Sequence, residues 1–501
     1  MIFSQQLQAG ACSALVLFER YGVEALIILG ALGAAVVFGM VASTGNLLLA
    51  GLAAGMIVGL LAFANAAITL WLILFLGLFV AGLAPIWAEG LSKKAVWGIS
   101  VLGLILFLSA ASRRLLNPGS AEKQPLFIWL ALVFVGYALL NGAAQSTLFE
   151  LASGFKRYFQ VMGVCFALAW LSFSRADMDR WVRLFAALVI VQLPFALYEL
   201  LKLVPVRESL QYAYPGMIPI DVVAGTFGAT RYAGGANAEM ASFLVIALGF
   251  LLARRSEKLI TPRHFAVLGL FALTPLFLGE TKVVVIFLPV MFVTLYGREL
   301  LRKPHLAVLW LIVGALLTLG AAYAYLQLVK AQSLSEMLSD TMAYNMGDKG
   351  YGGYYLNRLT GLLFWFHQQG LHDPVSFFFG CGIGSAHDAT GGTIALRYPG
   401  FGVSLTALSS LLWEQGLLGS LLFYGVLVSA WLTAGRLRAA RFGRRIMADA
   451  AGIQAALSLC MIYPVYRSTL LEGLPFQILF WGMLGYLAWL YRESRHAEAA
   501  A

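Results

Sequence analysis

The sequence predicts an all-α polytopic membrane protein with about 12–14 transmembrane helices and a large structured loop outside the cytoplasm. Three observations support this prediction: scarce charge, many long apolar runs and an uneven distribution of Lys and Arg. Of the 501 residues, 60% are hydrophobic and only 12% are charged. Soluble domains carry about 25% charged residues. A surface with so little charge suits lipid better than water.

The apolar runs approach the roughly 20 residues that a helix needs to cross a bilayer. They are apolar on all sides, which favours helices over the alternating strands of a barrel. The predicted spans are 23–41, 47–63, 66–84, 95–111, 125–141, 157–173, 182–201, 238–253, 264–279, 282–297, 306–327, 411–434, 449–465 and 475–491. No cleavable signal peptide is expected, because the N-terminus lacks a basic region followed by a short apolar run.

One alternate set of short loops carries most of the basic residues, and these loops are predicted to face the cytoplasm. Both termini then lie inside. The inner basic residues are Arg113, Arg114, Lys123, Arg175, Arg180, Arg183, Arg254, Arg255, Lys258, Arg263, Arg298, Arg302, Lys303, Arg436, Arg438, Arg441, Arg444, Arg445, Arg492 and Arg495. This orientation predicts a multi-pass protein of the bacterial inner membrane whose functional face is periplasmic.

The chain is accordingly divided into four parts. Residues 1–201 form the N-terminal transmembrane helices, and 202–328 form the central helices with a first outer loop over 202–237. Residues 329–410 form the large outer loop, and 411–501 form the C-terminal helices. The large loop is rich in Tyr, Phe, Trp and Leu, which argues against disorder. A loop of this length is typically functional.

Composition also argues against several partners and cofactors. The net charge of +10 is explained by basic cytoplasmic loops, so no nucleic acid is expected. Cys12, Cys165, Cys381 and Cys460 are scattered, without a Cys-x-x-Cys pair, which favours free thiols over metal ligands. No short metal-binding motif occurs, and neither a metal nor a cofactor is expected.

Outer segments should be poor in Lys and Arg, so the exceptions suggest a function. Each such residue could have a purely structural role, in which it pairs with a nearby acid or reaches lipid headgroups. Several of them, however, lie at the outer ends of different spans, which a helical bundle would bring together. An unbalanced cluster of cations would bind an anion, and the bidentate guanidinium suits phosphate. The residues concerned are Arg231, Lys282, Arg358, Arg397 and Arg467.

Two glycine-containing segments are consistent with a ligand at this face. In GGAN the amides before Asn237 could meet an anion at a helix N-terminus. In GCGIGS the glycines, among them Gly382 and Gly384, would permit close backbone approach to a substrate. The second string is not a dinucleotide-binding fingerprint, because no strand–helix unit surrounds it.

A general base is also sought among the outer residues. His387 is the first candidate, because it follows the glycine run and precedes Asp388. The alternative is an ordinary polar role, which is more common for a histidine in a loop. Glu239 and Glu280, at outer helix ends, are the next candidates, and the bland alternative for each is a salt bridge.

The order of these motifs resembles a known family. NRLTGLLFWFHQQGLHDPVSFFFGCGIGS, followed by LLWEQGLLGSLLFYGVL, resembles the signature region of the O-antigen ligase/polymerase superfamily, the Wzy and WaaL proteins. RYAGGANAEMASF is similar to that family's Arg…Gly…Asn-x-x-x-Ala stretch, and GETKVVVIF has Lys282 where the family often has arginine. The resemblance covers roughly residues 190–435 and implies a GT-C-like membrane fold.

The resemblance implies glycan transfer from an undecaprenyl-pyrophosphate-linked oligosaccharide to an acceptor hydroxyl at the periplasmic face, by an inverting, metal-independent glycosyltransferase. Arg231, Lys282 and Arg358 would bind the donor pyrophosphate, with chain-length regulators or other assembly proteins as partners. Family ligases carry a His-Asn pair before the Glu-x-Gly string, which GFGVSLTALSSLLWEQG lacks. A polymerase of O-antigen, capsule or exopolysaccharide repeats is therefore favoured over a ligase acting on lipid A-core in lipopolysaccharide synthesis. A lipid-linked oligosaccharide flippase is the non-enzymatic alternative.

Overall fold

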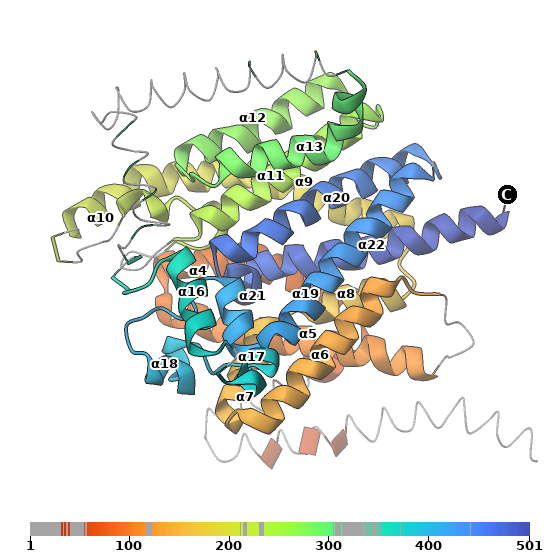
Figure 1. Ribbon diagram of the computed structural model, residues 1–501. Helices are drawn as coiled ribbons and strands as arrows, with labels where there is room; N and C mark the ends of the chain where they lie inside the picture. The colour runs from red at the N-terminus through yellow and green to blue at the C-terminus, as the bar shows by residue number, and fades with distance from the viewer. Residues whose placement is uncertain are drawn as a thin grey trace, which may run out of the picture. The chain divides into compact units, whose positions relative to one another are not determined.

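The computed structural model describes residues 58–116, 123–210, 218–229, 235–303, 353–370, 372–440 and 442–500, with a few single residues between them. The chain divides into two compact units, Met1–Thr69 and Leu70–Ala501. Little of the first unit is described. The arrangement below concerns the second unit, which is helical throughout its described parts (Figure 1).

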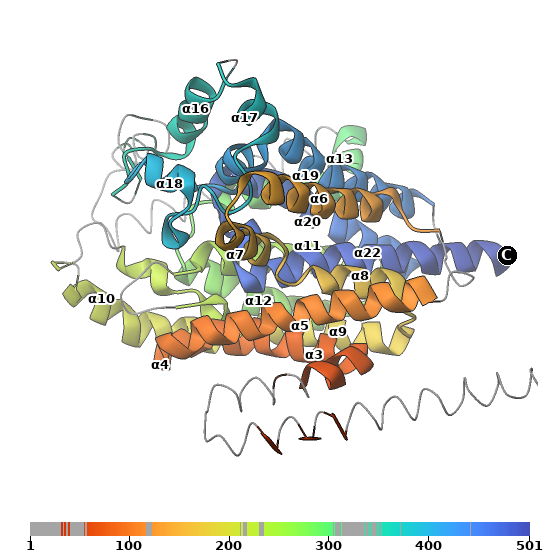
Figure 2. The same ribbon diagram turned by 90° about the horizontal axis from the view of Figure 1, so that it is seen from below.

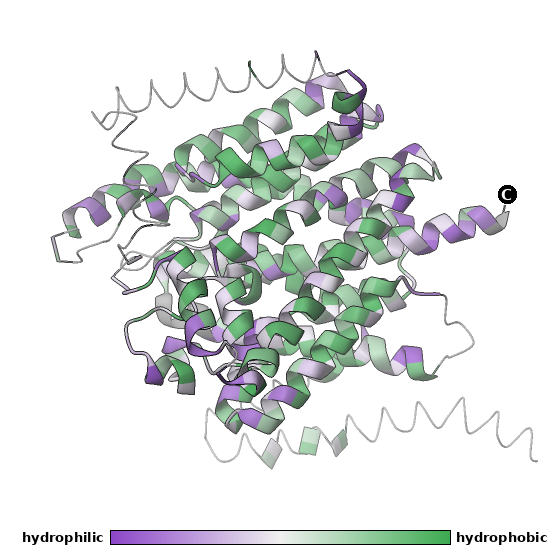
Figure 3. Ribbon diagram, in the orientation of Figure 1, coloured by the Kyte–Doolittle hydropathy of each residue, from purple (hydrophilic) through white to green (hydrophobic). Residues whose placement is uncertain are grey.

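Nine helical segments in the described residues are long and apolar enough to cross a membrane. They bear out nine of the predicted spans and confirm a polytopic membrane protein. The segments are Ala66–Trp87, Lys94–Leu116, Leu126–Gln145, Arg175–Leu210, Asn237–Ser256, Val284–Arg302, Ala407–Ala439, Arg444–Tyr466 and Leu474–Glu498. The predicted spans 23–41, 47–63 and 306–327 fall wholly or mostly outside the described residues. Hydrophobic residues follow the lengths of the helices, and hydrophilic residues gather toward their ends (Figure 3).

Two predicted spans differ in the structure. The span 264–279 is the shorter helix α12 (Pro262–Leu278). The span 157–173 is interrupted at Gln160–Val161, between α7 (Leu148–Phe159) and α8 (Met162–Trp170). Helix α8 is almost wholly buried. Gly103 of α5 (Glu89–Leu116) and Gly163 of α8 lie where these two segments touch. A Cβ on Gly103 would collide with the backbone of Gln160 and Val161, and a Cβ on Gly163 would collide with the backbone of α5. Apolar sequence cannot distinguish such an internal helix from a lipid-facing one.

The helices of this unit pack on one another in several pairs. Helix α8 packs on α5 and α22 (Leu474–Ala500). Helix α20 (Arg444–Tyr466) packs on α19 (Ala407–Ala439), α11 (Asn237–Ser256) and α13 (Val284–Arg302). Helix α6 (Leu126–Gln145) packs on α19, and α9 (Arg175–Tyr198) packs on α12. The central position of α20 explains why its membrane segment is mostly buried.

Ion pairs join several helices at one end of this unit. Arg254 contacts Asp449 at 2.6 Å, Arg175 contacts Glu493 at 2.6 Å, and Arg445 contacts Asp179 at 2.9 Å. These pairs link the C-terminal ends of α11 and α22 to the N-terminal ends of α9 and α20. We call this end of the unit the basic end. It carries the residues that the sequence assigns to the cytoplasmic face.

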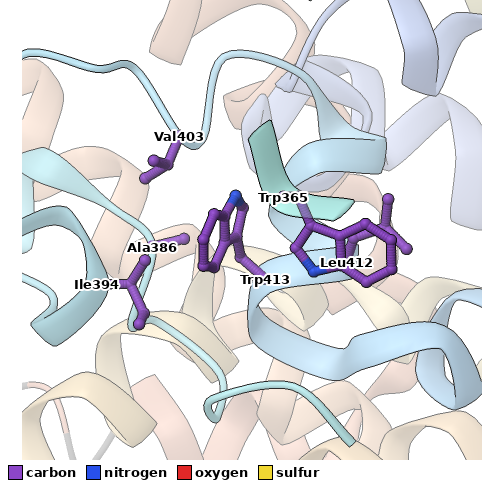
Figure 4. Packing of buried hydrophobic residues seen from close by; sticks show 6 residues of the cluster. All are labelled: Trp365, Ala386, Ile394, Val403, Leu412 and Trp413. Carbon is purple, nitrogen blue, oxygen red and sulfur yellow. The ribbon is translucent and has the colours of Figure 1, made fainter. Parts of the chain in front are cut away.

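The opposite end carries the short helices of the large loop. They are α16 (Arg358–Gln368), α17 (Pro374–Phe379) and α18 (Thr393–Arg397), which lie with α7 and α21 (Thr469–Glu472) (Figures 1 and 2). The described part of the segment predicted as the large outer loop thus contains short helices, and its location outside the cytoplasm stays a prediction. Its own core comprises Trp365, Ala386, Ile394, Val403, Leu412 and Trp413 (Figure 4). Aromatic pairs bind it to α19, with the rings of Tyr398 and Trp413 5.7 Å apart.

A kink in α19 receives this loop. Gly416 has φ 64° and ψ −167° within an otherwise helical run. The break leaves carbonyl groups without helical partners. Helix α6 supplies donors: Tyr137 donates to the carbonyl of Gln415 at 2.9 Å, and Asn141 donates to that of Glu414 at 3.1 Å.

We predict that Gly416→Ala destabilises the protein much more than Gly391→Ala. Gly391 has φ 63° and ψ 39°, a left-handed conformation that costs another residue about 1–2 kcal/mol. Gly416 has φ 64° and ψ −167°, a region that essentially only glycine adopts, and substitution there costs on the order of 1–3 kcal/mol of backbone strain. A Cβ on Gly416 would lie 2.5 Å from Phe378 backbone, whereas one on Gly391 meets nothing within 4 Å. That overlap adds roughly 1–3 kcal/mol. Thermal unfolding of the detergent-solubilised variants measures the difference, and equal losses would contradict the packing described.

Candidate functional site

A cavity of about 290 Å³ opens at the end of the unit opposite the basic end. Four segments form it: the start of α16, the turn after the glycine run, the stretch before α19 and the connection between α20 and α21. Its lining residues are Tyr351, Tyr354, Arg358, His387, Asp388, Ala389, Gly402, Ser404, Leu405, Tyr466, Arg467, Ser468 and Glu472. Three residues singled out from the sequence, Arg358, His387 and Arg467, thus lie in one cavity.

The connection between α20 and α21 supplies the largest group of polar residues. Helix α20 ends at Tyr466, soon after Pro464, and Arg467 is extended with φ −151° and ψ 156°. The Arg467 carbonyl accepts a hydrogen bond from the Ala407 amide at 3.2 Å, which fixes this strand-like residue to the start of α19. A continuous helix would spread Arg467 and Glu472 over different faces, whereas the break places both on the cavity.

Arg358 is held by two tyrosines. Asn357 caps α16, accepting hydrogen bonds from the Leu359 and Thr360 amides, so Arg358 begins the helix. The Cζ atom of Arg358 lies 4.2 Å from the ring centroid of Tyr351 and 4.6 Å from that of Tyr466. Its Nε donates to the Tyr466 carbonyl at 2.7 Å. Contact with two aromatic rings and a hydrogen bond to a carbonyl together restrict the guanidinium, as an anion clamp requires.

Arg467 is held by the start of α11. Its Nη2 donates to the Gly235 carbonyl at 3.1 Å, and its Nε lies 3.7 Å from Oε1 of Glu239. The charge of Glu239 raises the pKa of Arg467, so this guanidinium stays cationic at any physiological pH. Glu239 is 3% exposed and does not line the cavity. Asn237 is also buried and donates to Asp221 at 3.1 Å. Both residues therefore support Arg467 and its surroundings rather than the cavity wall.

Acidic groups and a histidine complete the lining. Oε2 of Glu472 lies 3.7 Å from Nε2 of His387 and 3.3 Å from Oγ of Ser468. Oε1 of Glu472 lies 3.7 Å from Nη1 of Arg157 on α7. Burial raises the pKa of Glu472, although Arg157 opposes this shift. Burial also raises the pKa of Asp388, against a hydrogen bond from Tyr354. The cavity thus combines two firmly held cations with a partly shielded carboxylate.

The glycine run packs against protein rather than lining the cavity. A Cβ on Gly382 would collide with Ser146, and one on Gly384 would collide with the Glu150 backbone. Both glycines have φ 88°, which disfavours any other residue. Their position gives no support to the predicted substrate contact. The run instead docks on the kink of α19, where the Ala386 amide donates to Glu414 at 3.1 Å.

The remaining predicted residues lie elsewhere. Arg231 lies outside the described residues. Lys282, at the turn between α12 and α13, is exposed and does not line the cavity. Arg397, at the end of α18, is likewise exposed and interacts electrostatically with Asp373. Glu280 lies in the same turn as Lys282 and does not line the cavity. The predicted grouping of Lys282 with Arg358 is therefore not seen in the cavity.

Sequence reasoning missed Glu472 and the tyrosines that hold Arg358. A signal for Glu472 was present, because Arg467 and Glu472 are the charged residues of the short outer segment YRSTLLEGL. Tyr351 and Tyr466 carried no signal, since nothing in their spacing indicates stacking on a distant arginine.

No group of three His, Cys, Asp or Glu side chains within the described part of the chain is placed to hold a metal ion. No protein-family model matches this chain, and no curated protein matches its sequence. The fold and the cavity therefore define the class as a multi-pass helical membrane protein with a mixed-charge cavity at one end of its helices.

We predict that the cavity and the basic end face opposite sides of the membrane. In a background without the native cysteines, Ala389→Cys places an exposed thiol at the cavity, and Ala440→Cys places one at the basic end. A membrane-impermeant maleimide added to spheroplasts should label Ala389→Cys at once and Ala440→Cys only after permeabilisation. Labelling of both without permeabilisation would contradict this orientation.

Proposed function

We propose that the protein transfers a glycan from an undecaprenyl-pyrophosphate-linked donor to an acceptor hydroxyl at the periplasmic face of the bacterial inner membrane. The favoured reaction is polymerisation of O-antigen, capsule or exopolysaccharide repeat units. The observation that carries the proposal is the presence of Arg358 and Arg467 in one cavity, at the end of the helices opposite the basic end.

Two positioned guanidinium groups suit a diphosphate. Each can donate two parallel hydrogen bonds to phosphate oxygens, and a planar, stacked guanidinium is already oriented for this contact. Because Arg358 contacts two tyrosine rings and Arg467 is anchored by Glu239 and Gly235, binding need not order either side chain.

The same arrangement suits departure of the diphosphate. In an inverting displacement, the acceptor oxygen forms a bond to the anomeric carbon while the bond from that carbon to the phosphate oxygen breaks. The electron pair leaves with the pyrophosphate, whose charge grows in the transition state. Positioned donors stabilise such charge by roughly 3–4 kcal/mol each. A transporter would gain nothing from stabilising a transition state, and its site would typically lie near the bilayer midplane.

We predict that Arg358→Ala abolishes long-chain glycan without preventing membrane insertion. Losing one donor to a leaving diphosphate costs about 100–1,000-fold in rate. Arg438→Gln is the matched control, because it removes another half-buried guanidinium that donates to a backbone carbonyl, that of Thr294 at 2.9 Å, at the basic end. A polysaccharide gel of complemented deletion strains measures chain length. Wild-type polymer with Arg358→Ala would refute the proposed role.

The deletion strain itself should retain single repeats and lose long chains, which is the pattern of a missing polymerase. Accumulation of carrier-linked polymer would instead identify a ligase, and repeats trapped on the cytoplasmic face would identify a flippase. The gel and a protease- or lectin-accessibility assay of spheroplasts separate the three outcomes. Either of the last two would replace the polymerase assignment.

A further inference from the structure

We propose that Glu472, rather than His387, is the catalytic base that accepts the proton of the acceptor hydroxyl. This inference rests on the proposed glycan transfer and names the residue that completes it. Glu472 lines the cavity together with the two arginines. Glu472 is the last residue of α21, two residues before α22 begins, and it therefore lies outside the large loop.

One ring nitrogen of His387 is held by a hydrogen bond, and the other faces Glu472. Nδ1 accepts a hydrogen bond from the Ala389 amide at 3.1 Å. An amide can only donate, so Nδ1 carries a lone pair and the neutral ring has its proton on Nε2. That Nε2 lies 3.7 Å from Oε2 of Glu472. A ring in this state has no free lone pair for a substrate proton. His387 is therefore a positioning residue, which presents an N–H toward the carboxylate.

Glu472 has the surroundings of a usable base. Its side chain is 22% exposed, so it is shielded but open to the cavity. Its oxygens are approached by Arg157, Ser468 and His387 at 3.3–3.7 Å. These three contacts orient the carboxylate. Because they are long and only three in number, they leave part of its four lone-pair positions open to a substrate. The titratable groups that face it are Lys156, Arg157 and Tyr158 from α7, His387 and Tyr354 from the loop segments, and Glu414 from α19.

The other nearby acids are less suited. Glu239 is buried, does not line the cavity and faces Arg467. Asp388 lines the cavity, but its carboxylate is hydrogen-bonded by Tyr354 and is more exposed. Glu472 is thus the shielded carboxylate with access to the cavity among these three.

The proposed step balances without a further reactant. The acceptor O–H bond breaks, its proton moves to a carboxylate oxygen of Glu472, and the oxygen bonds to the anomeric carbon of the donor. The bond from that carbon to the diphosphate breaks, and the electron pair leaves with the lipid diphosphate beside Arg358 and Arg467. The protonated carboxyl then loses its proton to water at the cavity mouth.

The test compares Glu472→Gln with Glu493→Gln in the full-length protein in nanodiscs. Glu493 is a matched control, because it also pairs with an arginine and is 21% exposed, but it lies at the basic end. The donor is the lipid-linked saccharide extracted from the deletion strain. Glu472→Gln should lower turnover at least 100-fold while binding undecaprenyl pyrophosphate with wild-type affinity. Glu493→Gln should turn over normally.

Two further readouts separate a base from a residue that only supports the fold. Burial raises the pKa of Glu472, and a base must be ionised, so wild-type kcat/KM should rise with pH through a pKa above the usual carboxylate range. That limb should vanish in Glu472→Gln. Formate should partly restore turnover to Glu472→Ala by entering the vacated space as a base. His387→Asn should lower turnover less than Glu472→Gln and keep the pH limb.

The outcomes distinguish this inference from the proposed function. Retained turnover in a folded Glu472→Gln variant, or an unchanged pH profile, would overturn Glu472 as the base and leave glycan transfer intact. Failure of the wild-type protein to bind undecaprenyl pyrophosphate or to extend the extracted donor would overturn both. Loss of undecaprenyl pyrophosphate binding together with turnover in Glu472→Gln would assign the residue a role in binding and overturn the catalytic one.

Discussion

The cavity depends on the docking of the glycine run onto the kink of α19. Gly380 and Gly416 face each other so closely that a Cβ on either would lie 2.5 Å from backbone of the other segment. The Cys381 amide donates to the Trp413 carbonyl at 2.8 Å, and the Ala386 amide donates to Glu414. Leaving a buried amide such as that of Ala386 unpaired costs about 1–3 kcal/mol. His387 follows the run by two residues and lines the cavity, so this contact sets the position of the cavity wall.

The segments GCGIGS and LLWEQG therefore form one contact, in which the loop packs on α19. Neither set of glycines lines the cavity, and Glu414 is buried beneath it. They hold the loop on the bundle, while the charged residues of the cavity come from flanking segments. Arg358 enters from the start of α16, and Arg467 and Glu472 enter from the break after α20. Different residues thus serve packing and chemistry: the glycines and Glu414 hold the loop, while Arg358, Arg467 and Glu472 line the cavity.

Each charged residue of the cavity is stabilised by identifiable neighbours. Arg467 is stabilised by the buried Glu239, which keeps it cationic and in place. Arg358 instead contacts the rings of Tyr351 and Tyr466. Glu472 is partly buried, yet Arg157 on α7 tempers the cost of its negative charge. The cavity thus holds cationic and acidic side chains together, as the proposed transfer requires.

The two arginines of the cavity could be selected from the sequence because they depart from a general rule. Arg358 and Arg467 stood out because basic residues are unexpected on the outer side, and the structure places both in the cavity. The same rule also selected Lys282, which is exposed elsewhere, because an outer location says nothing about direction. Helix lengths were predictable from hydropathy, but the break before α8 was not, since internal and lipid-facing helices are equally apolar.

Glu472 escaped the sequence analysis for a similar reason. Its importance comes from a break in the chain that turns it toward His387, some 85 residues away in sequence. Gly382 and Gly384 were predicted to contact substrate, because the sequence does not show which part of the protein they pack against. Spacing indicated that backbone must approach something closely, and only the structure identifies that neighbour as α7 and α19.

The most direct test of this account is a cryo-EM map of the full-length protein in nanodiscs with undecaprenyl pyrophosphate. We expect diphosphate density within hydrogen-bonding distance of the guanidinium groups of Arg358 and Arg467, with the Glu472 carboxylate facing the same space. Diphosphate density at another place, with Arg358 and Arg467 remote from it, would contradict the account.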